Sequence, residues 1–293
     1  MRFTTRDLLP VIAPYRLDLT VDALRRLASN AVDVVGDDGA YYRALSIDGE
    51  AVLVRVSQRD DATLELQASG SRARHAAPIV CRMLGTEVDL RAWYERSAKI
   101  PWLSRIAQEC RGVKPPRYPT LWEACAYAIV FQQISIHAAS AIMGRVVAAL
   151  GTAFEVAGTT IRTFPSPEAL LGADDDALRL AGLSTNKRLH LRSVAEAIVS
   201  GDLDAAAIER SPLEEAAAQL VGVRGIGPWS ASVVLLRGFG RMDAFPLRDS
   251  GVARTIKRLS GDPNVSIDAV LDVLGPTRGM LYFHLLLGKL KNL

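Results

Sequence analysis

The sequence predicts an α+β protein that is mostly helical, with a small α/β domain at its N-terminus and a helical body after it. Alternation of apolar and polar residues is confined to the first hundred residues, and apolar residues recur at helical spacing from Asp89 almost to the end. The stretch RGVKPPRYP at 111–119 separates these patterns, because its prolines and glycine interrupt both. We therefore expect domains at 1–112 and 113–293.

The N-terminal domain is expected to contain a small sheet with helices on one side. YRLDLTVDAL (15–24) begins as a short strand and turns helical, and YYRALSIDGEAVLVRVS (41–57) alternates about Asp48-Gly49, a dipeptide suited to a tight hairpin turn. ATLELQA (62–68) predicts a third strand, and RHAAPIVCRMLG (74–85) predicts a helix that ends at Gly85. The residues expected to face the core are Val52, Val54, Val56, Leu64 and Leu66.

From Asp89 onward we expect helices and no strand. Thr120 is a candidate N-cap for a helix through roughly Gln132, and Ser135 for another that extends to Leu150. Ser184 or Thr185 caps the helix NKRLHLRSVAEAIVS, and Pro212 opens PLEEAAAQLVG, because proline is favoured at the start of a helix.

Composition excludes several classes of protein. The longest apolar run, Ala124 to Phe131, is too short to cross a bilayer, and Asp7 and Pro10 interrupt LLPVIA, which excludes a secretory signal there. The three cysteines lack CxxC spacing and the four histidines are scattered, so we expect no disulfide framework, no side-chain metal site and no cofactor. A soluble, cytoplasmic, monomeric protein is expected.

The stretch GVRGIGPWSASVVL (222–235) breaks a helical pattern with three glycines and resumes it at once with Pro228. Two helices joined by a tight turn at Gly225 and Gly227 would gather several backbone N–H groups at the start of the second helix, where an anion can bind. The alternative is an ordinary helical hairpin in which the glycines only allow close packing. A mononucleotide P-loop is disfavoured, because no Lys-Ser/Thr pair follows Gly227.

Charge is distributed unevenly along the chain. The net charge of +3 is too small to indicate a nucleic-acid partner by itself. Between Ala218 and Ser260, however, seven basic residues stand against Asp243 and Asp249. We expect Arg224, Arg237 and Arg241 to surround the glycine turn and to contact a duplex backbone.

At this point the residues resemble a known family. LVGVRGIGPWSASVVLLRGFG followed by DAFPLRD is similar to the helix-hairpin-helix base-excision DNA glycosylases, and among them to the DNA-3-methyladenine glycosylase II group. LWEACAYAIVFQQIS, FPSPEAL, AGLSTNKRLHLRSVA and YYRAL extend the resemblance over nearly the whole chain. It implies a TATA-box-protein-like α/β domain, a helical glycosylase body with the hairpin at about 212–239, and an active site in a cleft between helical subdomains.

The resemblance implies that Asp249 is catalytic, because the family places an aspartate at this distance beyond the hairpin. Cleavage of an N-glycosidic bond leaves positive charge on the sugar, which a carboxylate stabilises while it orients the attacking water. A base methylated at N3 or N7 already carries positive charge and leaves without a strong general acid, so one carboxylate suffices. The residue pattern alone favours a helix N-cap at Asp249, and the two roles are compatible.

Trp229 is expected to form an aromatic wall against which a flipped base stacks, although packing of a helix start is the alternative. Relatives that also nick the strand carry a lysine here, which forms a Schiff base, so we expect base removal without strand cleavage. The remaining base-pocket candidates are Val233, Ser250 and Thr277, which the resemblance implies, and Phe131. Aromatic residues of the family are missing at the first three, which predicts a weaker preference for cationic bases unless Phe131, Tyr127 or Trp122 enters the cleft.

Base removal requires that the nucleotide leave the duplex and that a side chain fill the gap. The resemblance places this wedge at Gln133, preceded by Gln132, although both can instead cap the end of their helix. The other DNA-binding residues expected are Gly225, Gly227, Arg224 and Arg248. Backbone carbonyls near Val221, Val223 and Ile226 could hold a monovalent cation, as the resemblance implies.

These observations favour a monofunctional DNA glycosylase of base excision repair that removes 3-methyladenine and 7-methylguanine type bases from double-stranded DNA, without lyase activity, in the bacterial nucleoid. A helix-hairpin-helix protein that binds DNA or senses damage without cleaving it is the alternative from another class. Asp249 discriminates between them, because a binding module has no need of a carboxylate at that position.

Overall fold

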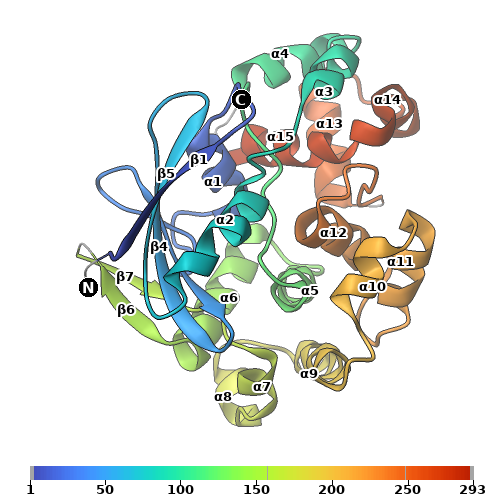
Figure 1. Cartoon of the computed structure of the whole chain (residues 1–293). Coiled ribbons are helices and arrows are strands. Elements are labelled where there is room, and N and C mark those ends of the chain that lie inside the picture. The colour runs from blue at the N-terminus through green and yellow to red at the C-terminus, as the bar shows by residue number, and fades with distance from the viewer. Residues whose placement is uncertain (1–2, 157, 248, 291–293) are drawn as a thin grey trace.

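The computed structural model describes residues 3–156, 158–247 and 249–290, without the side chains of Ser250, Lys289 and Leu290. A curved antiparallel sheet lies on one side of the molecule and most of the helices lie on the other (Figure 1). The α+β, mostly helical class is therefore confirmed.

The sheet has five antiparallel strands in the order β1-β5-β4-β3-β2. Their bounds are β1 Thr5–Pro10, β2 Val34–Val35, β3 Tyr41–Ile47, β4 Glu50–Gln58 and β5 Thr63–Ser69. Asp48 and Gly49 join β3 to β4 with φ angles of 51° and 77°, as the predicted tight turn requires. The predicted core positions of β4 and β5 are buried, including Val52 and Leu64.

Helices α1 (Leu17–Arg25) and α2 (Ala76–Leu84) belong to this domain, and α2 ends at Gly85 as predicted. The short strand expected at the start of YRLDLTVDAL is wrong, because Tyr15 and Arg16 lie outside any strand. Arg16 instead precedes α1 in an extended conformation without extending the sheet.

The expectation of no strand beyond Asp89 is also wrong. A hairpin of β6 (Ala153–Val156) and β7 (Thr159–Arg162) follows the long helix α6, and Thr163 bridges to Ala44 of β3. Its apolar residues Val156 and Ile161 pack with Tyr42 and Leu53 in a small second core on the outer face of the sheet. Strands of four residues carry too short an alternation to stand out in a helical context.

The helical body contains α3 Arg91–Ser97, α4 Pro101–Glu109, α5 Leu121–Val130, α6 Ile136–Leu150, α7 Pro167–Leu171, α8 Asp175–Leu180, α9 Thr185–Ser200, α10 Ala205–Arg210, α11 Leu213–Val221, α12 Pro228–Phe239, α13 Ser250–Ser260, α14 Ile267–Leu274 and α15 Gly279–Leu290. Side chains of Thr120, Ser135 and Ser184 accept backbone N–H groups at the starts of α5, α6 and α9. These predicted N-caps are confirmed. Among the described helices, none combines the length and apolarity that a bilayer crossing needs.

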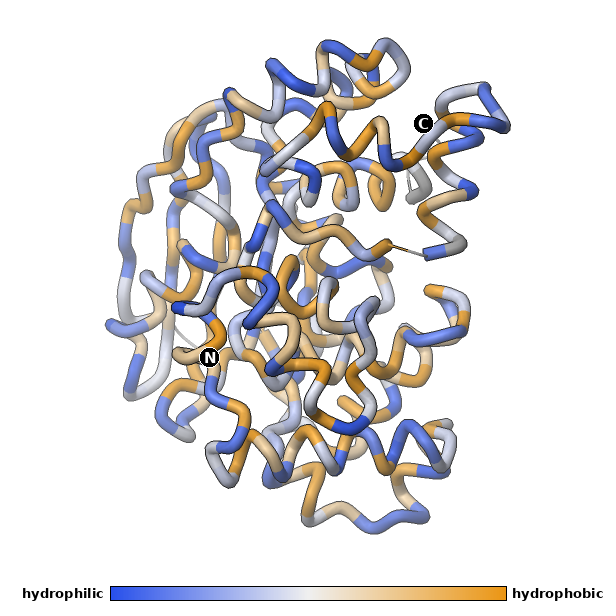
Figure 2. The backbone as a smooth tube through the Cα atoms, turned by 90° about the vertical axis from the view of Figure 1, so that its right-hand side faces the viewer, coloured by the Kyte–Doolittle hydropathy of each residue, from blue (hydrophilic) through white to orange (hydrophobic). Residues whose placement is uncertain are grey.

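The helices α3 and α4 lie on the N-terminal side of the boundary expected at residue 112. They nevertheless contact α13, α14 and α15 from the end of the chain. One continuous apolar core runs through both halves of the molecule, from Leu9 to Leu287. Hydrophobic and hydrophilic residues alternate along the outer helices, as elements with one buried side require (Figure 2).

A buried ionic cluster joins the sheet to α5. Arg43 of β3 donates to Asp33 and to Glu123, each at 2.5 Å, and the exposed fraction of each of the three side chains is at most 2%. Tyr41 donates its hydroxyl to Asp33 at 2.8 Å. Because two carboxyl groups share one guanidinium out of contact with water, burial raises the pKa of Glu123 to about 7, although Arg43 opposes the rise.

The raised pKa of Glu123 predicts a loss of stability as pH increases. An unfolded glutamate has a pKa near 4.3, so between that value and 7 the folded chain holds a proton that the unfolded chain lacks. We expect the free energy of unfolding to fall by on the order of 2–3 kcal/mol between pH 5 and pH 8. Glu123→Gln, which mimics the protonated acid, should remove most of that fall in urea titrations. An unchanged pH dependence in the variant would assign it to other groups.

Candidate active site

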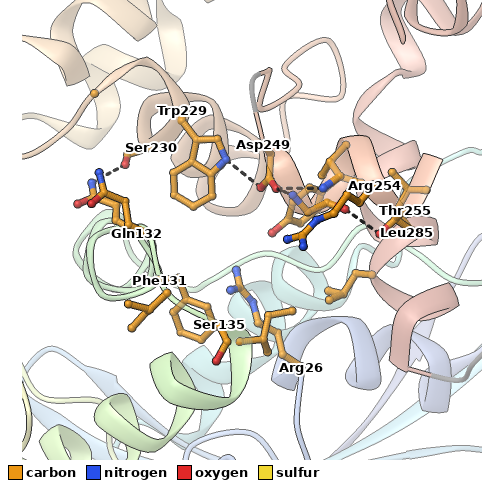
Figure 3. Close-up of a pocket in the computed structure, with 18 of the residues that line it drawn as sticks. Arg26, Phe131, Gln132, Ser135, Trp229, Ser230, Asp249, Arg254, Thr255 and Leu285 are labelled. Atoms are coloured by element: carbon orange, nitrogen blue, oxygen red, sulfur yellow. Dashed lines mark hydrogen bonds between the residues drawn. The ribbon is translucent and has the colours of Figure 1, made fainter. Parts of the chain in front are cut away.

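A cavity of about 860 Å³ opens between the two halves of the helical body. Its walls come from five places: the end of α1, the turn between α5 and α6, the start of α12, the first turns of α13, and α15. Its described lining includes Asp249, Trp229, Phe131, Gln132 and Gln133, which the sequence assigned to the site. Residues more than a hundred positions apart are therefore brought to one hollow (Figure 3).

Asp249 and Trp229 are hydrogen-bonded to each other in this cavity. The indole Nε1 of Trp229 donates to Oδ2 of Asp249 at 3.0 Å (Figure 3). The other carboxylate oxygen accepts the backbone N–H groups of Gly251 and Val252 at 2.8 and 3.0 Å, so Asp249 is the N-cap of α13. These three donors fix the carboxylate at the cavity wall. The capping role foreseen for Asp249 is confirmed, and it leaves the group half-buried beside the hollow.

The glycine turn joins α11 to α12 as a tight hairpin. Gly225 has a φ of +98°, and a Cβ atom there would lie 2.4 Å from Cβ of His190, so both backbone and packing require glycine. Gly227 differs, because its φ of −89° suits any residue and a Cβ atom would meet nothing within 4 Å. In the described part of the chain, the N–H groups of both glycines have no backbone acceptor. The turn thus presents two N–H groups without a backbone acceptor, and the space around Gly227 is open.

The turn after α5 faces the hairpin across one edge of the cavity. Gln132 donates its side-chain amide to the carbonyl of Gly225 at 2.9 Å and to Oγ of Ser230 at 2.8 Å, which ties this turn to the hairpin. Gln133 is exposed and has a φ of +60°, a conformation that is uncommon for residues other than glycine. The geometry gives Gln132 a positioning role and leaves Gln133 exposed in the cavity lining.

Phe131 lines the cavity, but its ring face is covered. The guanidinium of Arg26 lies 4.1 Å from the ring centroid of Phe131. Tyr127 and Trp122, the other aromatic residues considered for the cleft, are buried and are not among the lining residues. Tyr127 instead stacks on Tyr118 with ring centroids 4.5 Å apart.

The predicted pocket residues Val233 and Thr277 lie away from the cavity lining. Val233 is buried with 1% of its surface exposed, inside the packing of α12. The Thr277 hydroxyl donates to the carbonyl of Leu274 at 2.8 Å. The side chain of Ser250 and the whole of Arg248 lie outside the described residues.

The arginines around the hairpin have three different environments. Arg224 is exposed on the turn. Arg237 is fully buried, donates to the carbonyls of Ala23 and Leu24 at 3.0 Å, and stacks over Tyr118, so its expected contact with a duplex is wrong. Arg241 pairs with Asp243 at 3.1 Å and donates to the carbonyl of Ser211. Counting charge along the sequence does not distinguish these environments.

Val221, Val223 and Ile226, whose carbonyls the resemblance offered to a monovalent cation, all lie in or beside the turn. The carbonyl of Val223 accepts the N–H of Ile226 at 3.1 Å, which uses one of its lone pairs. Three backbone carbonyls are chemically suited to such a cation. No group of three His, Cys, Asp or Glu side chains could hold a metal ion in the described ranges.

Comparison with known proteins agrees with this geometry. Residues 126–269, which include the α5–α6 turn, the hairpin and Asp249, match the HhH-GPD superfamily of base excision DNA repair proteins. A probable bifunctional transcriptional activator/DNA repair enzyme AlkA of Mycobacterium tuberculosis is 32% identical over 86% of this chain and 50% of its own length. A DNA-3-methyladenine glycosylase of Bacillus subtilis is 28% identical over 64% of this chain and 62% of its own length. The chain thus spans between half and two thirds of these relatives.

Among solved structures, a 3-methyladenine DNA-glycosylase from Archaeoglobus fulgidus superposes with a TM-score of 0.81. The alignment covers 96% of this chain and 98% of that one at 24% identity, which shows a shared fold. The hairpin, the matching family segment and these relatives agree with one another. The chain belongs to the helix-hairpin-helix superfamily of base excision DNA repair proteins, in its AlkA-like group.

Proposed function

We propose that this protein is a monofunctional DNA glycosylase of base excision repair that acts on alkylated bases in double-stranded DNA. One observation carries the proposal: the carboxylate of Asp249 lies in a cavity of about 860 Å³ and is held there by the first turn of the hairpin helix. Trp229 thus links the hairpin turn, for which we propose phosphate binding, to the carboxylate of Asp249. The relatives named DNA-3-methyladenine glycosylase support the same class of substrate.

The hairpin turn is proposed to bind a backbone phosphate of the duplex. The free N–H groups of Gly225 and Gly227 lie at the start of α12, where the helix dipole favours negative charge. Arg224 is exposed on the same turn and adds a side-chain cation. Such a contact is independent of sequence and weakens as salt increases.

The damaged nucleotide is proposed to leave the stack and enter the cavity. Gln133, exposed at the rim, is the candidate to fill the gap in the duplex. The half-buried ring of Trp229 lines the hollow and offers a face to the extruded base.

Asp249 is proposed to stabilise the positive charge that develops on the sugar as the C1′–N bond breaks. Its carboxylate is already oriented by three N–H donors, so it needs no rearrangement when the charge appears. The same group can accept a proton from the water that adds to C1′. A base alkylated at N3 or N7 departs as a neutral molecule.

Strand cleavage is not expected, because a Schiff base with the sugar needs an amine in the cavity. The described lining contains no lysine. The family resemblance also implies that Trp229 stands where members with lyase activity carry a lysine. A helix-hairpin-helix protein that only binds DNA remains the rival function. Under that function the N-cap role explains the carboxylate of Asp249, but nothing explains the cavity beside it, which is large enough for a base.

The decisive assay measures base release from duplexes that carry one 3-methyladenine or one 7-methylguanine. Release of free base, with strand breaks appearing only after alkali or heat, is the expected result. Binding of both duplexes without any release would support the rival function, and strand breaks without alkali or heat would contradict the monofunctional assignment.

Gly227→Ala tests the proposed phosphate contact. A methyl group at Gly227 meets nothing within 4 Å in the protein, so the variant should fold; its stability should fall by no more than about 1 kcal/mol, because alanine is a poorer N-cap than glycine. We expect its affinity for undamaged and damaged duplexes to fall roughly tenfold, because the methyl occupies the space that a phosphate needs. Fluorescence anisotropy at two salt concentrations measures this.

Gly144→Ala in α6 is the matched control, because a Cβ atom there also meets nothing within 4 Å. Its affinity should equal that of the wild-type protein. Equal affinities of the two variants would show that the duplex does not approach Gly227.

A further inference from the structure

Lys187 lies in the first turn of α9, where a positive charge is disfavoured. Its backbone N–H donates to Oγ of Ser184, the N-cap of this helix, at 3.4 Å. The N-terminus of a helix carries partial positive charge, so a lysine there weakens its own helix. The side chain is also half-buried, and burial lowers the pKa of its ammonium group. A lysine kept here against both effects needs a compensating contact in another element.

That contact is with the end of α5. The ammonium group of Lys187 donates to the backbone carbonyls of Val130 and Gln132, to the latter at 3.0 Å. The last carbonyls of a helix have no partner within it and carry partial negative charge. All ten residues of α5 are buried, so water has little access to this end of the helix. Lys187 therefore supplies hydrogen bonds there that water does not.

The same contact restrains the backbone of Gln133. The carbonyl of Gln132 and the N–H of Gln133 belong to one planar peptide unit. A change in φ of Gln133 turns this unit, so the bond from Lys187 to the carbonyl opposes such a change. The observed φ is +60°, which a residue other than glycine adopts at an energetic cost. The side chain of Gln132 is bound to the hairpin, so both anchors of Gln132 lie outside its own turn.

We propose that Lys187 is a positioning residue that holds Gln133 in its left-handed backbone conformation, from which the Gln133 side chain enters the duplex. This inference rests on the proposed function, in which Gln133 fills the gap that the extruded nucleotide leaves. Lys187 is not among the described residues that line the cavity, so it acts through the turn and not on the reacting atoms. The step that it serves is extrusion of the nucleotide, before the glycosidic bond breaks.

Lys187→Met and Gln133→Ala test the proposal as a double-mutant cycle. Methionine donates no hydrogen bond from its side chain, and alanine removes the Gln133 side chain while φ stays positive. Lys187→Met should lower the single-turnover rate constant for 7-methylguanine release about 5- to 30-fold, the factor by which the left-handed conformation is disfavoured when nothing holds it. Gln133→Ala should lower it at least as much. In the Gln133→Ala background, Lys187→Met should change the rate constant by less than about twofold, because no side chain is left to position.

Two further measurements distinguish positioning from other roles of the lysine. Lys187→Arg keeps a cation that donates to carbonyls, so it should recover most of the rate. Lys187→Met should bind undamaged duplex within about twofold of the wild-type affinity in fluorescence anisotropy. A larger loss would mean that Lys187 contacts a phosphate itself, or that α9 moves His190 away from Gly225 and disturbs the hairpin. Either result would overturn the proposal.

Lys99→Met is the matched control for the loss of one positive charge. Lys99 is exposed between α3 and α4 and is not among the described lining residues of the cavity. Its release rate constant should equal that of the wild-type protein. Melting temperatures are measured for every variant, and all rate constants are compared at a temperature below the lowest of them, so that each variant is folded.

The outcomes separate failure of this inference from failure of the proposed function. If the wild-type protein releases neither 7-methylguanine nor 3-methyladenine, the glycosylase function is wrong. If it releases them, and Lys187→Met lowers the rate constant equally with and without the Gln133 side chain, the positioning role is wrong while the function holds. The same conclusion follows if either single variant releases base at the wild-type rate, or if Lys187→Arg is as slow as Lys187→Met.

Discussion

Asp249→Asn is expected to lower the rate constant of base release by roughly 10³-fold, the effect of removing a preorganised charge from a developing cation. Asparagine keeps an oxygen that can accept the N–H groups of Gly251 and Val252, so α13 should retain its cap. Affinity for undamaged duplex should stay within about twofold, because phosphate contacts dominate that binding. Single-turnover release of 3-methyladenine measures the first quantity and fluorescence anisotropy the second.

The hydrogen bond from Trp229 to Asp249 means that Asp249→Asn should also change stability, and a second variant at Trp229 controls for that effect. The amide nitrogen of an asparagine would face the indole N–H, so two donors would meet at about 3 Å and stability should fall by about 1–3 kcal/mol. Trp229→Phe removes the indole donor, and the double variant should regain most of that stability while staying inactive. Release at the wild-type rate by Asp249→Asn would show that the carboxylate charge is not catalytic.

Arg43→Met is expected to lower the free energy of unfolding by about 3–5 kcal/mol, the range for removal of one partner from a buried ion pair. Asp33 and Glu123 would then be two buried acids without the cation that both contact. Because Arg43 lowers the pKa of Glu123, its removal should also raise that pKa further. Urea unfolding at pH 5 and pH 8 measures both effects, and the destabilisation should be greater at pH 8.

Arg91→Met is the matched control for this prediction. Arg91 also pairs with an aspartate, Asp89, but the exposed fraction of its side chain is 87%, so its loss should change stability by less than about 1 kcal/mol. Adding Asp33→Asn and Glu123→Gln to Arg43→Met should restore part of the lost stability, because the buried charges are then absent. Equal destabilisation by Arg43→Met and Arg91→Met would contradict the assigned importance of burial.

Much of the fold follows from local patterns in the sequence. The β3–β4 hairpin was predictable because Asp48 and Gly49 both tolerate a positive φ and the strands on either side alternate. The strands β1, β6 and β7 were missed for a common reason, since each lies at an edge and is short or interrupted. TRDLLP of β1 carries two charges and a proline, a composition that an edge strand tolerates and a central one does not.

Only the part of the candidate site that lies within one sequence motif was predictable. Asp249, Trp229 and the two glycines lie in a single segment with a recognisable spacing, and the structure brings the first two into hydrogen-bond contact. Arg26 gave no such signal. It follows another arginine at the end of a helix, a pattern typical of a solvated helix terminus, and only the fold places it in a cavity with residues more than two hundred positions away.

Arg237 shows the opposite error, because a basic residue two turns after the hairpin is typical of a phosphate contact. In the fold its guanidinium lies over the rings of Tyr118 and Phe283 and donates hydrogen bonds to two backbone carbonyls of α1. Burial depends on the packing of α12 against distant elements, which no local pattern records.

The bond from Gln132 to the hairpin has a consequence for how a duplex must behave. Because its amide joins the α5–α6 turn to Gly225 and Ser230, the distance between the phosphate contact and Gln133 is set before DNA arrives. Lys187 adds to this by donating to the carbonyls of Val130 and Gln132. Under the proposed function the protein therefore keeps its shape on binding, and the double helix bends to fit it. Lesions that weaken stacking or pairing would then be extracted first, simply because the DNA around them bends at the lowest energy.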